Sequence, residues 1–420
     1  MFARALDELH RRSGARLLAQ LIRRIGRFDV AEDALQDAFA RALATWPAQG
    51  TPANPEGWLM RVALNRAIDQ LRHERLQLPD GEAVLAALEC GVAELDVAGG
   101  DAHWPDERLK LIFTCCHPAL APAAQVALSL RTLCGLTTAE IARAFVEPEA
   151  TTAQKLVRAQ RKIAAARIPY AVPGAETLQE RLATVLAVIY FVFNEGYAAS
   201  ASPALMRVDL CEEAIRLGDL LAELMPGEPE VLGLQALMAF HHARRATRSS
   251  PEGELVTLEA QDRARWDAGA IAAADAVLKR AIAMERPGPY QYQAAIAALH
   301  AKAACAEDTD WAQIAVLYRA LQVHLDTPVI DLNAAVALAM AGHLEAGLAR
   351  IDALERGGAL ARYHLLHAAR ADLLRRAGRP AEARAAYGRA LTLVQNAAER
   401  AYLERRLAAL PEPHAGAAHP

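Results

Sequence analysis

The hydrophobic positions in the first 75 residues recur with the 3.6-residue period of amphipathic helices. The pattern predicts helices over residues 4–27, 29–46 and 56–75, with a proline-rich loop over 47–55. The apolar stripe of the second helix is Ala31, Ala34, Leu35, Ala38, Phe39, Ala42, Leu43 and Trp46. Because each stripe occupies one side of its helix, the opposite sides face solvent or another molecule.

Those opposite sides are polar in the second and third helices. The second helix carries Glu32, Asp33, Gln36 and Asp37 opposite its apolar stripe. In the third helix Arg61, Asn65, Asp69 and Arg72 follow one another at close to i, i+4, i+8 and i+11. Each set therefore lies on one helix face, and both are candidates for binding another molecule.

A helix-turn-helix pattern follows near residue 135. Gly135 precedes Thr137-x-x-Glu140, a capping box, and Thr151-x-x-Gln154 predicts the start of a second helix. This helix is expected to bury Leu156, Val157 and Ile163, and to expose Gln154, Lys155, Arg158, Arg161 and Lys162. Two short helices, a tight turn and a basic second helix indicate DNA binding. An ordinary helical hairpin with solvated charges is the alternative.

Beyond residue 171 the chain becomes alanine-rich and shows an internal repeat. Gly342-x-x-x-x-Gly347 and Gly378-x-x-x-x-Ala383 lie 36 residues apart, close to the tetratricopeptide period of about 34. The sequence predicts further helices over residues 230–244, 270–285 and 290–305. Stacked helix pairs form a concave surface that binds a peptide, protein or ligand. Alternatively, these helices only stabilise or dimerise the chain.

Composition agrees with an all-α protein, because alanine and leucine dominate a chain of 420 residues that is 53% hydrophobic. We expect a cytoplasmic protein, since no apolar run predicts a membrane helix or secretory signal and the scattered cysteines suit free thiols. Cys115-Cys116-His117 lacks the partners of a metal site, so buried thiols are expected there. No phosphate-binding or nucleophile motif is found, so we expect neither an enzyme nor a cofactor.

The formal net charge of −4 is unevenly distributed. Residues 1–76 carry +3, residues 77–105 carry −6, residues 106–170 carry +4, and the remainder carries −5. Two basic blocks separated by an acidic strip favour localised contact with a polyanion, although excesses of this size are common on ordinary surfaces.

These motifs resemble the extracytoplasmic-function (group IV) branch of the sigma-70 family of RNA polymerase sigma factors. Asp29-Val-Ala-Glu-Asp-Ala-Leu-Gln-Asp-Ala-Phe39 is similar to region 2.2, which docks on core polymerase. Trp58-Leu-Met-Arg-Val-Ala-Leu-Asn-Arg-Ala-Ile-Asp-Gln-Leu-Arg72 is similar to regions 2.3–2.4, which open the −10 element. The helix-turn-helix resembles region 4, which reads the −35 element. The segment 106–118 and the long extension resemble a subgroup with tetratricopeptide-like C-terminal domains.

The resemblance implies a domain plan and three contact sets. The domains would be region 2 over 1–76, an acidic linker over 77–105, region 4 over 106–170, repeats over 171–411 and a tail over 412–420. The core-polymerase set is Asp29, Glu32, Asp33, Gln36, Asp37 and Phe39. The −10 set is Arg61, Asn65, Arg66, Asp69 and Arg72. The −35 set is Thr152, Gln154, Lys155, Arg158, Arg161 and Lys162.

The implied partners are core RNA polymerase and promoter DNA, with a protein or ligand partner at the repeats and no membrane. Ala150, Thr152 and Ala153 depart from the usual region 4 residues, so promoter preference does not transfer. Two other hypotheses stay open. The chain could be a polymerase-independent helix-turn-helix regulator with a sensing repeat domain, although the region 2-like motif speaks against it. It could also be a repeat scaffold that has lost promoter activity.

Overall fold

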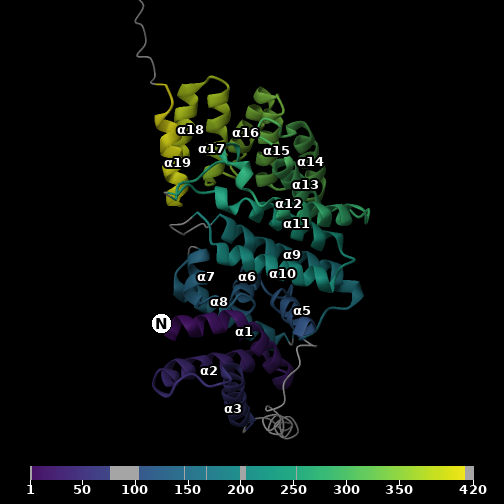
Figure 1. Cartoon of the computed structure of the whole chain (residues 1–420), viewed down its shortest axis with the longest axis vertical. Helices are drawn as coiled ribbons and strands as arrows, with labels where there is room; N and C mark the ends of the chain where they lie inside the picture. The colour runs from purple at the N-terminus through teal and green to yellow at the C-terminus, as the bar shows by residue number, and fades with distance from the viewer. Residues whose placement is uncertain are drawn as a thin grey trace, which may run out of the picture. The chain divides into compact units, whose positions relative to one another are not determined.

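The computed structural model describes residues 2–75, 104–198 and 205–411, apart from 146, 167 and 252, and its described residues confirm an all-α fold without a β-strand. The chain divides into two compact units, Met1–Val192 and Phe193–Pro420 (Figure 1). The first unit holds α1 (Phe2–Ile25), α2 (Phe28–Gln49), α3 (Pro55–Arg75), α5 (Trp104–Cys115), α6 (Pro122–Thr132), α7 (Thr138–Ala144), α8 (Glu149–Ala165) and most of α9 (Ala175–Tyr197).

The second unit contains the remaining helices. They are α10 (Val208–Leu224), α11 (Pro229–Ala243), α12 (Ala268–Ile282), α13 (Pro289–Lys302), α14 (Trp311–His324), α15 (Pro328–Met340), α16 (Leu344–Gly357), α17 (His364–Arg376), α18 (Pro380–Leu393) and α19 (Ala397–Ala408). The predicted linker lies almost wholly outside the described residues, as does the predicted tail. Within the described chain, no helix is both long and apolar enough to cross a membrane.

Helices α1, α2 and α3 pack together around their apolar stripes. The predicted core positions Ala31, Ala34 and Ala38 of α2 and Leu59 of α3 are fully buried. Gly26 ends α1 with a φ of 73°, as a left-handed glycine at this position commonly does. The predicted loop begins later than expected, because α2 continues through Pro47 to Gln49.

Helices α7 and α8 form the predicted hairpin, with two corrections. The first capping box is confirmed: the Glu140 amide donates to Thr137 Oγ1 at 3.2 Å, and the Thr137 amide donates to Glu140 Oε2 at 2.8 Å. The second helix begins at Glu149 rather than near Thr151, with Pro148 at its N-cap position. Val157, expected in the core, is 42% exposed because only Thr152, Leu156, Ala159 and Ile163 form the buried stripe.

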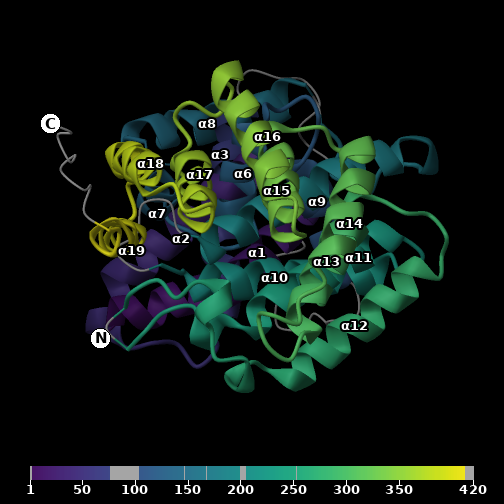
Figure 2. The ribbon, with the colours of Figure 1, turned by 90° about the horizontal axis from the view of Figure 1, so that it is seen from above.

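In the second unit, each helix from α13 to α19 contacts the next along the chain (Figures 1 and 2). Gly342 and Gly378 lie in the turns of the α15–α16 and α17–α18 hairpins, with φ values of 97° and 71°. The 36-residue spacing in the sequence therefore corresponds to two successive helical hairpins. Gly347 is needed for close packing, since a Cβ there would lie 2.5 Å from Ala339 Cβ and 2.6 Å from Ala335 O.

A long connection between α11 and α12 is tied to the C-terminal helices of the same unit. Arg376 on α17 pairs with Glu259 at 2.6 Å, and Arg405 on α19 pairs with Glu254. Trp266, at the end of this connection, is buried and donates its indole N–H to Thr247 Oγ1 at 2.9 Å. The connection is thus part of the packed unit and not a loose loop.

Candidate functional site

The polar stripe predicted on α3 lies on an exposed helix face. The side chains of Arg61, Asn65, Asp69 and Arg72 are all exposed, while Leu59, Ala63, Ala67 and Ile68 hold the opposite side of the helix in the core. Arg72 lies 3.9 Å from Asp69, an exposed i, i+3 ion pair that contributes little stability. Two cations, an amide and a carboxylate are therefore available along about three turns of one helix.

Two further residues of this region are held by α2. Arg66, assigned to the −10 set, forms a 2.5 Å ion pair with Asp37 of the core-polymerase set. Both side chains are exposed, so the pair links the two candidate surfaces without burying either charge. Trp58 packs edge-on against Trp46 with ring centroids 5.2 Å apart, which makes it a packing residue between α2 and α3.

The polar face of α2 is only partly open. Asp33 and Gln36 are exposed, while Asp29 is half-buried and paired with Arg27 at 2.5 Å. Loss of surrounding solvent and the nearby charges of Asp29 and Asp37 raise the pKa of Asp33. Phe39 is half-buried and forms an edge-to-face contact with the His10 ring, with centroids 4.7 Å apart.

Glu32, predicted to contact a partner from this face, is covered by the helix-turn-helix part of its own chain. It is 4% exposed. Arg131 Nε of α6 donates to its Oε1 at 3.1 Å, and Gln160 Nε2 of α8 donates to its Oε2 at 2.5 Å. Gln36 adds a third donor at 3.1 Å. Burial raises the pKa of Glu32, although the hydrogen bond from Gln160 and the charge of Arg131 oppose the shift.

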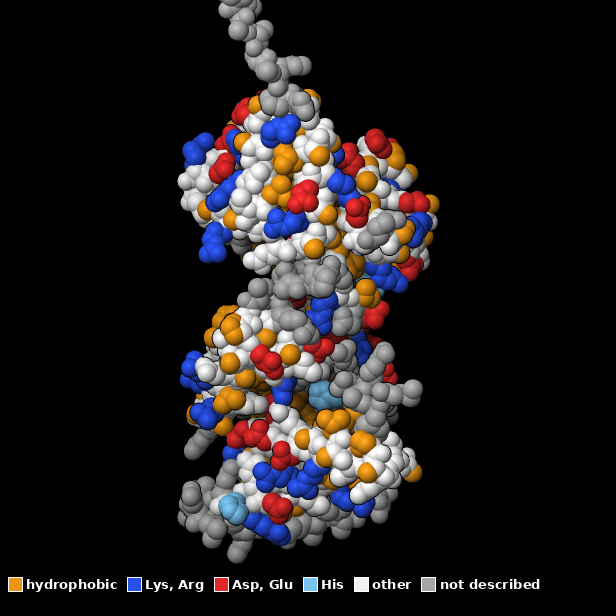
Figure 3. All heavy atoms as spheres, turned by 90° about the vertical axis from the view of Figure 1, so that its left-hand side faces the viewer, with side chains coloured by type: hydrophobic (Ala, Val, Ile, Leu, Met, Phe, Trp, Pro, Cys, Tyr) orange, Lys and Arg blue, Asp and Glu red, His pale blue; other side chains and the backbone are white. Residues whose placement is uncertain are grey.

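The outer face of α8 carries most of the predicted DNA-contact residues. Gln154, Arg158, Arg161 and Lys162 are exposed. On the face drawn in Figure 3, basic and acidic side chains are mixed over the lower end of the first unit, where α2 and α3 lie, so neither sign dominates there.

Two members of the −35 set depart from the expected exposure. Thr152 is 0% exposed and its hydroxyl donates to Glu147 Oε1 at 2.5 Å, so it belongs to the helix interior and not to the outer face. Lys155 is half-buried, with Nζ 2.8 Å from Glu147 Oε1 and 4.3 Å from the centre of the Phe145 ring. Because the buried stripe of α8 includes Thr152, this residue does not belong to the candidate DNA-contact surface.

Sequence reasoning missed Arg131 and Gln160, the two residues that α6 and α8 direct at Glu32. Gln160 gave no local signal, because a glutamine beside four basic residues reads as part of a solvated face. Arg131 did give one: it is a lone charge at the end of the apolar run from Val126 to Leu130. A charge placed there needs a buried or half-buried partner.

The vicinal cysteines are buried thiols, as expected. Cys115 Sγ lies 3.1 Å from Thr132 Oγ1, and Cys116 Sγ lies 3.7 Å from Ser129 Oγ. Burial raises the pKa of the Cys116 thiol to about 12 and that of Cys115 well above its usual value, so both are unreactive. Across the part of the chain that the structure describes, no three His, Cys, Asp or Glu side chains gather to hold a metal ion.

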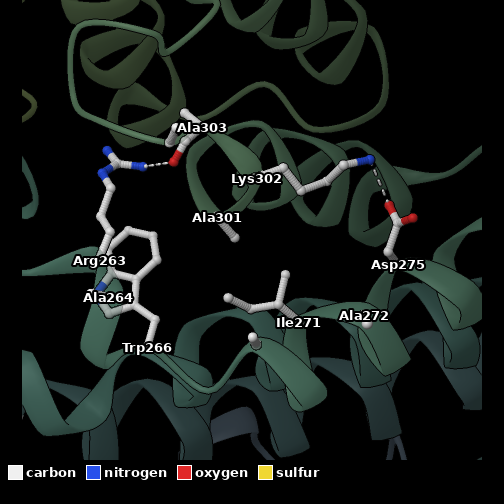
Figure 4. Close-up of a pocket in the computed structure, with 11 residues that line it drawn as sticks. Arg263, Ala264, Trp266, Ile271, Ala272, Asp275, Ala301, Lys302 and Ala303 are labelled. Carbon is white, nitrogen blue, oxygen red and sulfur yellow. Dashed lines mark hydrogen bonds and ion pairs between the residues drawn. The ribbon is translucent and has the colours of Figure 1, made fainter.

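The second unit contains a pocket of about 510 Å³ between α12, the end of α13 and the connection before α12 (Figure 4). Trp266, Ile271 and small alanines line its interior. On one side Arg263 donates to the Ala303 carbonyl at 2.9 Å, and on the other Lys302 pairs with Asp275 at 3.0 Å. A mainly apolar interior between two charged edges has the general form of a ligand or side-chain pocket.

Comparison with known proteins connects this geometry to a family. Residues 9–77 match the model of sigma-70 region 2, and residues 181–282 match a family of unknown function, DUF6596. The "Probable ECF RNA polymerase sigma factor SigI" of Mycobacterium tuberculosis is 30% identical over 164 residues, which span 39% of this chain and 55% of that protein. An uncharacterized protein of Rhizobium meliloti, R00370, is 44% identical over 392 residues, 93% of this chain and 92% of that protein.

Helices α1 to α3, which carry the polar faces described above, are thus a sigma-70 region 2, and the protein is of the sigma-70 class. Over nearly its whole length, the chain belongs to the same family as the Rhizobium protein R00370. The second unit begins within the segment that matches DUF6596, and that match assigns no activity to it.

Proposed function

We propose that the chain is an alternative sigma factor of the extracytoplasmic-function type, acting in the cytoplasm with core RNA polymerase and promoter DNA. The observation that carries the proposal is the exposed polar stripe of α3 within a matched sigma-70 region 2. In this role α2 contacts core polymerase, α3 opens the −10 element, and α8 reads the −35 element.

The α3 stripe suits strand opening on chemical grounds. Phosphates are neutralised by cations, which Arg61 and Arg72 supply at opposite ends of the stripe. A base taken out of the stack must find new hydrogen bonds and a surface to lie on. Asn65, exposed between the two arginines, has both a donor and an acceptor for a base edge.

The outer face of α8 suits double-stranded DNA. Arg158 and Arg161 are long exposed cations three residues apart on one helix, a spacing that directs both to one side. An α-helix fits the major groove, where arginine reads guanine and also contacts phosphate. Lys155 is the weaker candidate, because its ammonium already pairs with Glu147.

For the second unit we propose a regulatory role through the pocket in Figure 4. Its mainly apolar interior and its two charged edges fit an amphipathic ligand or an apolar side chain of a protein partner. Substituting Ala301→Trp would fill the pocket without removing a charge. If the pocket is regulatory, this change alters transcription at a fixed protein concentration while core-polymerase affinity stays constant; unchanged transcription would contradict the role.

The test of the main proposal asks whether the exposed face of α2 binds core polymerase. Affinity for sigma-free core polymerase is measured with an Asp33→Ala/Asp37→Ala double variant, and Arg41→Ala, another exposed residue of α2, serves as its matched control. We expect the double variant to bind at least about tenfold more weakly, from the loss of two charged contacts. Tight DNA binding by the protein alone, with no binding to core polymerase, would instead favour the polymerase-independent regulator.

A further inference from the structure

One residue of the polar face of α2, Glu32, is covered by two side chains that the sigma-factor comparison does not explain. Glu32 is a buried carboxylate that accepts hydrogen bonds from α6 and α8, which together with α5 and α7 make up the helix-turn-helix part of the chain. Arg131 Nε reaches it from α6, and Gln160 Nε2 reaches it from α8. Asp33 and Gln36, on the same face of α2, stay exposed beside this contact.

We propose that Glu32, Arg131 and Gln160 form a latch that docks the helix-turn-helix part onto the polymerase-binding face of region 2, so that one face of α2 serves two mutually exclusive partners. The inference rests on the proposed function, because the second partner is core polymerase. In the free protein the latch occupies the face, and core polymerase competes with it.

The hydrogen bonds to Glu32 make the contact between the two parts of the chain specific, and their chemistry also allows the two parts to separate. A buried carboxylate without partners is expensive, so both donors favour the docked arrangement, in which α1 also contacts α5 and α6. Arg131 is itself held by Thr138 Oγ1 of α7 at 3.2 Å, which orients its guanidinium toward α2. When the two parts separate, Glu32 and Gln160 regain water, so the polar groups lose little on opening.

The surrounding packing supports a contact that can open. A small cavity of about 30 Å³, lined by His10, Leu35, Arg131, Gly135 and other residues, remains between α1, α2 and the turn after α6. Its lining is mainly apolar but includes Glu32, Gln36 and Arg131, and a space of this size accommodates about one water molecule. The contact between the two parts is therefore partly polar and incompletely filled, unlike the fully buried apolar core inside each part.

Competition has a measurable consequence for affinity. A protein that binds only in its open state shows a dissociation constant raised by the reciprocal of the open fraction. A population that is about 90% docked would weaken apparent core-polymerase affinity about tenfold. Removing a latch donor from the α6 or α8 side should therefore strengthen core binding, the opposite of what loss of a binding residue does.

The test uses the full-length protein with Gln160→Ala and Arg131→Ala, and the exposed α8 residue Glu149→Ala as the matched control. Carbodiimide labelling of carboxylates, read by mass spectrometry, reports the exposure of Glu32 in the protein alone. Fluorescence anisotropy with sigma-free core polymerase reports affinity. We expect Glu32 to be protected in the parent and in Glu149→Ala, and labelled about tenfold faster in both latch variants, with core affinity about three- to tenfold tighter.

Equal labelling of Glu32 in all four proteins would overturn the latch, whatever the polymerase does. Faster labelling in the latch variants with unchanged core affinity would overturn the competition. Gln160→Ala keeps the proposal falsifiable if Arg131→Ala fails to fold, because it removes one half-buried amide at a helix surface. Absence of core binding by every protein would overturn the proposed function, and labelling would still decide whether the two parts dock through Glu32.

Discussion

Single residues in this protein take their chemistry from burial more than from their neighbours in the sequence. Cys115 and Cys116 are adjacent, yet each is buried against a different hydroxyl of α6, Thr132 or Ser129. Cys305 in the second unit is exposed. Because burial raises the pKa of both vicinal thiols, neither forms the reactive thiolate near neutral pH.

We therefore predict that iodoacetamide modifies Cys305 in the native protein and leaves Cys115 and Cys116 unmodified at pH 8. Peptide mass spectrometry after labelling measures all three sites in one experiment. The same reaction in urea should modify all three cysteines. Modification of Cys115 or Cys116 at the rate of Cys305 under native conditions would show that α5 and α6 do not enclose them.

Asp372 of α17 links its own helix to α19 through its charge. Burial opposes its charge, but hydrogen bonds from Arg376 and Arg375 outweigh burial and lower its pKa. Arg406 of α19 adds a contact at 3.0 Å. A lowered pKa means that the stabilisation is complete above the unfolded-state value of 3.8 and is lost as pH falls through the folded-state value.

Asp372→Asn should lower the free energy of unfolding by about 1.5–3 kcal/mol at pH 7, the range for hydrogen bonds to charged groups. The difference from the parent should shrink toward zero as the pH falls below 3.8. Urea unfolding at several pH values measures both, and the exposed Asp326→Asn is the control with no expected effect. A difference independent of pH would show that the carboxylate charge is not what stabilises the site.

At the scale of elements, the close packing of α16 on α15 depends on Gly347. A side chain at Gly347 would meet Ala339 and the Ala335 carbonyl of α15, so α16 could not keep its position. We predict that Gly347→Ala destabilises the protein by about 1–3 kcal/mol, as overpacking does. Gly357→Ala, in the same helix with open space around it, should be neutral or slightly stabilising. Thermal unfolding compares the two, and equal effects would contradict the packing argument.

A functional prediction at the same scale concerns the outer face of α8. Arg158→Ala should weaken binding to the promoter −35 segment by about 1–3 kcal/mol if it reads a base, or lower the salt dependence of binding if it contacts phosphate. Holoenzyme binding to promoter fragments across a range of salt concentrations distinguishes these. Unchanged affinity and salt slope would remove Arg158 from the DNA-contact surface.

Local periodicity predicted most elements, and tertiary contact decided what it missed. The Thr137–Glu140 box and most of the α2 and α3 stripes were correct because each depends on residues within one or two turns. Leu43, predicted in the α2 stripe, is instead 51% exposed. The closure of Glu32 was missed because its partners lie 99 and 128 residues away. The exposure of Val157 and the burial of Thr152 reflect the angle at which α8 packs on α6 and α7, which helix period alone does not fix.

At the scale of the whole molecule, one chain contains a sigma-70 region 2, a helix-turn-helix pair and a second helical unit. The proposal assigns promoter opening to the first, promoter reading to the second and regulation to the third. These assignments depend on one activity, initiation by core polymerase at defined sites. If that activity is absent, the exposed faces of α3 and α8 do not act together in promoter recognition.

The most direct measurement is run-off transcription with the purified protein, sigma-free core polymerase and fragments of the genome that encodes the chain. The account predicts discrete transcripts that require both components, and an Asn65→Ala/Arg61→Ala variant that retains core binding but loses at least about tenfold of the product. Arg41→Ala should transcribe like the parent. Absence of discrete transcripts, while the protein alone binds DNA tightly, would contradict the sigma-factor assignment.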